Sequence, residues 1–571
     1  MAVSETRTEH SMIRRVIGAI ILSACLFSAM LWPFFVTHVE ASSKTIYVNA
    51  ENANDPSQDG SATHPFDLIQ EGVDVAGSGD TVEVASGVYY ESVQINKSAI
   101  SLVGQKGSTI IDGKGAGSVG IRLYHTPPDY TESVSISGFT VRNFSGMLGK
   151  GITLSRSINT RLRDNSMVGN TYNFGDYTLQ VQDIDTSNTV DEKPIYYWVN
   201  QRDKQVPADA GFVALVGSTN ITVMDLNLTN NVQGLVLKNT TRSLIENVHV
   251  SGNWDGIYLE RWSNSNTLID SIVSGNLFMG IYVSTSSGNV IANNLILNNA
   301  YGLLLDSTVF EYTIGNTTTG NTVRDNVFVG NIVANSSTNS VYLDGCQDNL
   351  FFHNNFVNSV HEVESLNSTS RWDDGMEGNF WSNYSGEDID KDGLGDSPHL
   401  LTENDQDNHP LMGQFSNFDV IWQKETFAVT AISNSTISTF NFSQPDKLIS
   451  FSVISPDGAA GFCRVSMPTD LFGGPYALIL DGANTTGFLE ESNGTHCFLY
   501  FVYNSSPVNV EIEGTSVIPE FPSILSAFFP VALTSGVAMI VFAKRKPACD
   551  KVKLRKVVAR AELEHMANDA L

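Results

Sequence analysis

The chain has 571 residues, 42% of them hydrophobic, and a formal net charge of −28. That length can supply several packed domains. The two ends are neutral or basic, so the excess of acid lies in the long central body. Such a surface repels phosphate groups and attracts divalent cations, which excludes nucleic acid as a partner.

Both ends carry apolar runs that indicate contact with a membrane. Arg14 and Arg15 precede an uncharged stretch, so residues 1–41 are expected to be a signal peptide or an uncleaved N-terminal anchor. Residues 523–543 are uncharged and long enough for a transmembrane helix. Basic residues follow at once, so the tail 544–571 is predicted to be cytoplasmic and the acidic body to lie outside the cell. Frequent Asn-x-Ser/Thr triplets suit such an exported glycoprotein.

A repeat dominates the region between about residues 44 and 415. Asn220, Ser243, Asn266 and Asn289 open four similar segments, each 23 residues after the last. A second ladder of asparagines keeps the same interval: Asn230, Asn253, Asn276 and Asn299. Each is soon followed by glycine and a short strand of alternating apolar residues. Strands that stack on like strands from coil to coil would form inward apolar columns and asparagine columns at the bends.

This pattern predicts an all-β fold whose main body is a right-handed parallel β-helix. Helical solenoids need longer units with a 3.6-residue period, and a β-propeller does not explain the strict asparagine columns. Phe66, Ile69, Val73 and Ala76 share one face of a short helix suited to cap the first coil. The less periodic stretch 171–212 is expected to project from the solenoid as a hairpin or lobe.

Residues 418–515 lack asparagine ladders and have regularly spaced strand-like runs with Gly, Pro and Asn turns. They predict a small β-sandwich. Cys463 and Cys497 could form a disulfide in it, or remain two buried thiols; the sequence alone does not distinguish these states.

Residues Lys44–Leu411 resemble the pectin-lyase-like superfamily, and within it the archaeal surface proteins similar to NosD. The residues that carry this likeness are Gly79-Asp80-Thr-Val-Glu-Val, the Asn/Gly coils, and Gly378-Asn-Phe-Trp-Ser-Asn-Tyr leading into the acidic run from Asp388. The closing motif is distinctive, whereas the coils are common to the superfamily. Pro519-Glu520-Phe521 resembles archaeal PEF-type sorting tails, which implies attachment to the cell surface.

The strongest ligand motif is an acidic loop with alternate carboxylates around a tight glycine turn. Such loops bind one hard cation through oxygen atoms, with a backbone carbonyl at the seventh position. The expected ligands of a structural calcium ion are Asp388, Asp390, Asp392, the carbonyl of Leu394, and Asp396. His399 stands where calcium loops usually carry a bidentate glutamate, and a solvated acidic turn is the alternative.

A column of aromatic residues is the second candidate site. Tyr258, Tyr282 and Tyr342 occupy the central outward positions of successive strands, with Trp254 and Trp262 beside them. Flat apolar rings with polar edges can bind sugar rings, although aromatic residues also favour strands for their shape alone. The column favours binding of polysaccharide or cell-envelope glycans, in adhesion, recognition or envelope structure.

A carbohydrate-active enzyme, either a polysaccharide lyase or a glycoside hydrolase, is the alternative on the same face. Glycosidases need carboxylates on either side of the scissile bond, and the candidates are Asp255, Glu260, Asp373 and Asp374. None of them lies in a recognisable catalytic motif. A copper-delivery role like that of NosD comes third, because the histidines are scattered and no His-x-His or Met pair occurs; copper is therefore not expected as a cofactor.

Overall fold

The computed structural model describes residues 43–126, 129–177, 180–307, 322–422, 424–455, 460–504 and 506–517. The predicted leader 1–41, transmembrane helix 523–543 and tail 544–571 lie outside these ranges. Among the described residues, no helix is both long and apolar enough to span a bilayer.

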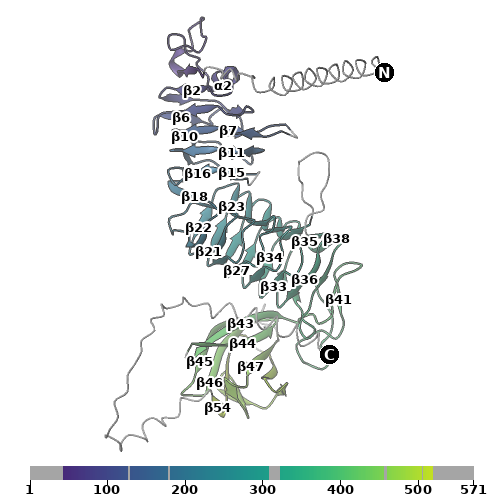
Figure 1. Cartoon of the computed structure of the whole chain (residues 1–571). Coiled ribbons are helices and arrows are strands. Elements are labelled where there is room, and N and C mark those ends of the chain that lie inside the picture. Colours follow the sequence, from purple (N-terminus) through teal and green to yellow (C-terminus); the bar gives the residue numbers. More distant parts are fainter. Residues whose placement is uncertain are drawn as a thin grey trace, which may run out of the picture.

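Most of the described chain is a stack of parallel coils (Figure 1). Each strand pairs with its counterpart one coil later, so Leu235 lies beside Ile257, and Ile257 beside Ile281. This confirms the predicted parallel β-helix and its repeat. One sheet, called here the long sheet, contains β23 (Gln233–Lys238), β26 (Asp255–Glu260), β29 (Met279–Ser284), β32 (Tyr301–Asp306), β35 (Asn339–Asp344) and β38 (His361–Leu366). The two sheets beside it contain β24 (Leu244–Glu246), β27 (Thr267–Ile269) and β30 (Val290–Ala292), and β25 (His249–Ser251), β28 (Ile272–Ser274) and β31 (Leu295–Leu297).

The asparagine ladders hold the bends of these coils. The Asn276 side chain is 2% exposed; its Oδ1 accepts the Asn253 backbone N–H at 3.1 Å, and its Nδ2 donates to the Asn299 Oδ1 at 3.1 Å. Each amide therefore bonds the coils before and after it, and few buried polar atoms in the column lack partners.

The helix α2 (Ile69–Val75) caps the start of the solenoid, as predicted. Ile69 and Val73 are fully buried in the core with β1 (Thr45–Val48) and β2 (Thr81–Val84). A Cβ atom on Gly72 would lie 2.8 Å from a Val48 methyl group, so the helix approaches this closely only because residue 72 is glycine.

The stretch 171–212 does not project, which corrects the expected lobe. It contains β15 (Tyr172–Asp176), β16 (Asp183–Ile184), β17 (Thr189–Val190), β18 (Lys193–Val199), β19 (Arg202–Gln205) and the start of β20 (Phe212–Val216), all of which pair within the solenoid sheets. The chain reverses where β17 pairs antiparallel with β18, and β18 then pairs parallel with β20. The stretch therefore joins two stacks, called here the first solenoid (β1–β17) and the second solenoid (β18–β40, where β40 is Phe380–Trp381).

The two solenoids have separate cores that meet at this junction. Along β20, Phe212 and Ala214 belong to the first core and Val213 and Leu215 to the second. The backbone N–H of Val232 donates to the Phe174 carbonyl at 2.8 Å, so β15 of the first solenoid lies beside the chain that enters β23. One face of the long sheet is therefore covered at its start by the first solenoid.

Beyond the solenoids, two antiparallel sheets of five strands pack on a common core. One contains β43 (Gln414–Trp422), β44 (Glu425–Ser433), β47 (Gly461–Pro468), β52 (His496–Tyr503) and β51 (Phe488–Ser492); the other contains β45 (Thr436–Ser443), β46 (Leu448–Ile454), β53 (Val508–Glu513), β49 (Ala477–Leu480) and β50 (Ala483–Thr485). This is a β-sandwich.

Cys463 and Cys497 are free thiols, so the disulfide alternative is wrong. They lie on neighbouring strands, but Cys463 pairs with Phe501 and Cys497 with Met467. Four residues of offset put them roughly 13 Å apart along the strands, well beyond the reach of a disulfide. Both thiols are buried, and burial raises the pKa of Cys463.

Candidate functional site

The outer face of the long sheet carries the predicted aromatic column. Tyr258 pairs in register with Tyr282, and Leu304 with Tyr342 in the coils that follow. The Tyr258 and Tyr282 rings meet edge to face with centroids 4.9 Å apart. We call Tyr258, Tyr282 and Tyr342 the tyrosine ladder.

The sequence did not single out two further rings that extend this ladder. Tyr301 contacts Phe278 at 5.3 Å and Tyr342 at 5.9 Å between ring centroids. Tyr301 begins its strand one residue before the bend glycine, in register with Met279 and Asn339. Regular alternation does not point to Tyr301, because it lies three positions before Leu304, the ladder position of its own strand; the ring contacts in the structure place it there.

The ladder is less exposed than a strand pattern suggests. Tyr258 is half-buried and packs against the first core, and its hydroxyl donates to Asp255 Oδ2 at 2.8 Å. Replacing Tyr258 would therefore cost packing, contrary to the expectation for an outward side chain. Tyr282 and Tyr342 are also half-buried but lie farther from the junction.

Trp262 is 48% exposed in the turn that follows β26. It and Arg261 both have positive φ angles, 68° and 48°. Positive φ angles recur at this bend in the coils before and after, at Asn239 (47°) and Thr285 (47°), so the conformation belongs to the repeat. The turn leaves the Trp262 ring exposed to solvent.

Carboxylates follow the ladder on the same face. Asp255 is 3% exposed, and burial raises its pKa to about 7. Glu260 lies 3.3 Å from the Arg261 Nε, and burial raises its pKa as well. Asp306 and Asp344 pair in register with each other; burial, and then Asp306, raise the pKa of Asp344. The sequence analysis missed this second pair.

Asp373 and Asp374 are not part of this face. They lie in the turn after β39 (Thr369–Arg371), where Asp374 Oδ1 accepts the Glu377 N–H at 2.8 Å and Asp373 Oδ2 accepts the Asn408 Nδ2–H at 2.8 Å. These bonds hold the turn in shape. The structure thus places Asp255 and Glu260 at opposite ends of β26, too far apart to act on one bond, and leaves the other two candidates elsewhere.

A lysine from the first solenoid completes one end of the face. Lys150 opens β11 (Lys150–Leu154), is 8% exposed, and holds its Nζ 4.2 Å from the centroid of the Trp254 ring. The Tyr172 ring lies 5.8 Å from the same nitrogen and 5.8 Å from the Trp254 ring. Burial, and then Arg122, lower the pKa of Lys150. We call Lys150, Tyr172, Trp254 and Asp255 the junction cluster.

The acidic loop brings three of its predicted ligands together. Among the described residues, only Asp388, Asp390 and Asp392 form a group of three or more potential metal ligands, with one oxygen of each within 4.8 Å of the others. Leu394 donates its N–H to Asp392 Oδ1 at 2.8 Å, while Asp396 Oδ2 accepts the Ile389 N–H at 2.6 Å. Burial raises the pKa of Asp388 and of Asp392, and the charge of Asp390 adds to both effects.

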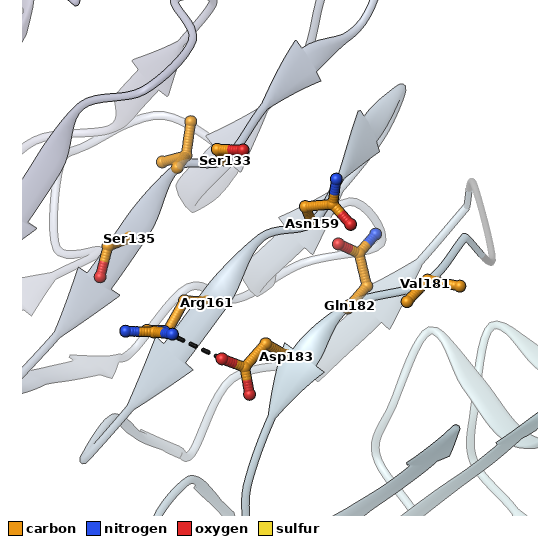
Figure 2. A pocket seen from close by; sticks show the side chains of 8 residues that line it. Ser133, Ser135, Asn159, Arg161, Val181, Gln182 and Asp183 are labelled. Atoms are coloured by element: carbon orange, nitrogen blue, oxygen red, sulfur yellow. Dashed lines mark hydrogen bonds and ion pairs between the residues drawn. The ribbon is translucent and has the colours of Figure 1, made fainter. Parts of the chain in front are cut away.

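A shallow pocket of about 370 Å³ lies on a different sheet, between β9 (Ser135–Ser137), β13 (Arg161–Arg163) and β16 (Figure 2). Val134 and Val181 line it together with polar side chains, and its Arg161 Nε is ion-paired with Asp183 Oδ2 at 2.9 Å. No aromatic ring lines it, so it offers a sugar ring no flat aromatic face on which to stack.

Residues 194–386 match the family model described as "Periplasmic copper-binding protein (NosD)", which is about a third of the chain. No curated protein matches the chain. Among solved structures, GH136 lacto-N-biosidase from Eubacterium ramulus is 13% identical with a TM-score of 0.27, over 57% of this chain and 68% of that one. The A-module of the Azotobacter vinelandii mannuronan C-5 epimerase AlgE6 is 17% identical (TM-score 0.22, 53% and 94%), and pectate lyase Pel9A is 10% identical (0.21, 61% and 82%). Such identities and TM-scores give no basis for assigning an activity. The result of these comparisons is therefore the similarity of the second solenoid to the NosD family model.

Proposed function

We propose that this protein binds glycans or cell-envelope polymers along the outer face of the long sheet, from β26 to β35. The observation that carries the proposal is the row of rings Tyr258, Tyr282, Tyr301 and Tyr342, with carboxylates beside it. Parallel coils repeat at about 4.8 Å, so rings one coil apart lie roughly one sugar residue apart along an extended polymer, and rings two coils apart roughly two. Ring faces would stack on the sugars while carboxylates accept hydrogen bonds from their hydroxyl groups.

The test replaces two rings that do not belong to a core. Tyr282→Ala with Tyr342→Ala should weaken binding of a neutral polysaccharide about tenfold or more, because each stacking contact contributes roughly 0.5–1.5 kcal/mol. Affinity electrophoresis and calorimetry on the full-length protein would measure the change. Tyr90→Ala is the matched control, since Tyr90 is 61% exposed and lies on the first solenoid. Unchanged binding in the double variant would contradict the proposal.

An enzyme acting on glycans is the second candidate, and Asp306 with Asp344 is the observation that favours it. Paired positions on neighbouring strands lie about 4.8 Å apart, close to the separation of two carboxylates in a retaining glycosidase. In that case the wild type would release reducing ends or unsaturated products, and Asp306→Asn would abolish the release. Under the binding proposal, no polysaccharide is shortened by either protein.

The family model's description raises copper, which the described side chains do not fit. The group of potential metal ligands among the described residues consists of three carboxylates, a donor set preferred by Ca²⁺ rather than by copper, which prefers imidazole and sulfur ligands. We therefore propose calcium at Asp388, Asp390 and Asp392, with a structural role.

The placement of the protein follows from the same proposal. A glycan-binding face suits an exported body held at the cell surface, with 523–543 in the membrane and 544–571 inside. What supports this is the charge pattern of the sequence, together with the family's description as periplasmic.

A further inference from the structure

Lys150 is a buried cation in an unusual position. The next residue, Gly151, lets the neighbouring coil approach closely, because a Cβ there would lie 2.4 Å from the Asn173 carbonyl oxygen. Lys150 stacks between Val119 and Tyr172 in the coils on either side. Its long side chain therefore runs across Tyr172 toward the second solenoid and ends over Trp254.

Among the described residues, the close contacts of the Lys150 ammonium are the two ring faces, and it forms no ion pair. Asp255 attracts the Lys150 ammonium from a distance, but a largely buried charge without a direct ion pair is still costly, and a ring face replaces only part of the lost hydration. The nearby guanidinium of Arg122 adds repulsion. The position is electrostatically unfavourable unless an anion completes it.

Asp255 attracts this ammonium, but both of its carboxylate oxygens accept hydrogen bonds from other groups. Its Oδ2 accepts the Tyr258 hydroxyl, and its Oδ1 accepts the Met279 N–H at 3.4 Å. With a pKa near 7, Asp255 is largely neutral below that pH and does not repel an incoming anion. Trp254 is only half-buried, so solvent reaches this end of the face.

We propose that the junction cluster is a subsite for the anionic group of an acidic sugar, either a carboxylate or a sulfate ester. Lys150 binds the anion, Trp254 and Tyr172 contact the ring, and Asp255 connects the subsite to the tyrosine ladder through Tyr258. This inference deepens the proposed glycan binding. Binding of an acidic polymer along the face rests on that proposed function, whereas binding of a single anionic sugar at the junction cluster does not.

The test compares Lys150→Met, which keeps the length of the side chain, with Lys114→Met, an exposed lysine on the same solenoid. Glucuronate and glucose 6-sulfate, each at matched ionic strength, should raise the melting temperature of the full-length wild type, and glucose should not. The Lys150→Met variant should lose both responses and the Lys114→Met variant should keep them. The first two sugars distinguish a carboxylate from a sulfate ester.

A second measurement uses polymers. Lys150→Met should lower affinity for polygalacturonate about tenfold and flatten its salt dependence, because one charge-assisted contact is lost. Affinity for a neutral polysaccharide on the ladder should not change. Without ligand, Lys150→Met should melt at a higher temperature than the wild type, since a largely buried charge that Asp255 and the two rings only partly compensate is removed.

Two results would overturn the subsite: a glucuronate response retained by Lys150→Met, or no response of the wild type to either anion. A failure of the proposed glycan binding by the tyrosine ladder would be seen separately. In that case the Tyr282→Ala, Tyr342→Ala variant would bind a neutral polysaccharide as well as the wild type does, while the response to the anionic monosaccharides would remain. If Lys150→Met does not fold, the Lys150→Gln variant and the response of the wild type to the two anions still test the subsite.

Discussion

Burial, more than residue type, sets the chemistry of single side chains in this protein. Asp255 and Asp390 are both aspartates in acidic surroundings, yet one is 3% exposed and the other lies on the surface. Burial raises the pKa of Asp255 to about 7 although the Tyr258 hydroxyl donates to it. The position in the fold therefore decides whether a carboxylate of this face is charged at neutral pH.

Asp255 should make stability depend on pH. The folded-state pKa of about 7 exceeds the unfolded value near 3.9. The contribution of protonated Asp255 to the free energy of unfolding is therefore full below about pH 4 and is lost as the pH rises through 7. Relative to Asp255→Asn, the wild type should lose up to about 4 kcal/mol of unfolding free energy over that window. Urea unfolding at several pH values measures it, and parallel pH profiles for the two proteins would contradict it.

At the scale of elements, the coil bends depend on the asparagine ladders. Every coil of the second solenoid places a polar side chain at the same bend, and each amide bonds the neighbouring coils. The 23-residue interval predicts the bonds from Asn253 to Asn276 and Asn299, because residues at equal positions in successive coils are neighbours. It is wrong for Asn230, which is exposed; Asn231 takes that place in the column and donates its N–H to Asn253 Oδ1 at 2.9 Å.

Asn276→Ala tests a ladder position. The change removes bonds to Asn253, Asn299 and the Val250 carbonyl and leaves their polar atoms buried, so it should cost about 2–4 kcal/mol of unfolding free energy. Asn227→Ala is the control, since Asn227 is exposed at the start of β22 (Asn227–Thr229) and should cost little. Equal effects of both changes would argue against a structural ladder. Chemical denaturation monitored by circular dichroism measures both.

At the scale of the whole molecule, the second solenoid and the sandwich are joined by a charged contact. Glu377 accepts hydrogen bonds from Arg464 of the sandwich at 2.7 Å and lies 2.7 Å from the His353 Nε2. Burial alone would raise the pKa of Glu377, but His353 and Arg464 outweigh it and hold the pKa at about 2. The Arg464 side chain also packs against Gly393 of the acidic loop, so the proposed calcium site adjoins this joint.

Calcium should therefore stabilise the joint. At a hundredfold excess over its dissociation constant, bound calcium adds about 2.7 kcal/mol to the free energy of unfolding. Asp390→Asn should reduce this gain, whereas Asp348→Asn, an exposed aspartate of the solenoid, should not. Differential scanning calorimetry with calcium and with chelator measures the effect; a wild-type melting curve unaffected by chelator would rule out the site.

The sequence by itself determined the parallel β-helix, its coil length, the capping helix and the register that aligns Tyr258 with Tyr282. It could do so because the repeat makes positions one coil apart spatial neighbours, so the periodicity encodes the contact. Only the tertiary structure decided that 171–212 joins two solenoids, that Tyr258 is half-buried, that Cys463 and Cys497 stay apart, and that Lys150 reaches Trp254. These features depend on a reversal of the chain and on contacts between coils far apart in sequence. The repeat pattern does not predict such contacts, because it relates only equivalent positions in neighbouring coils.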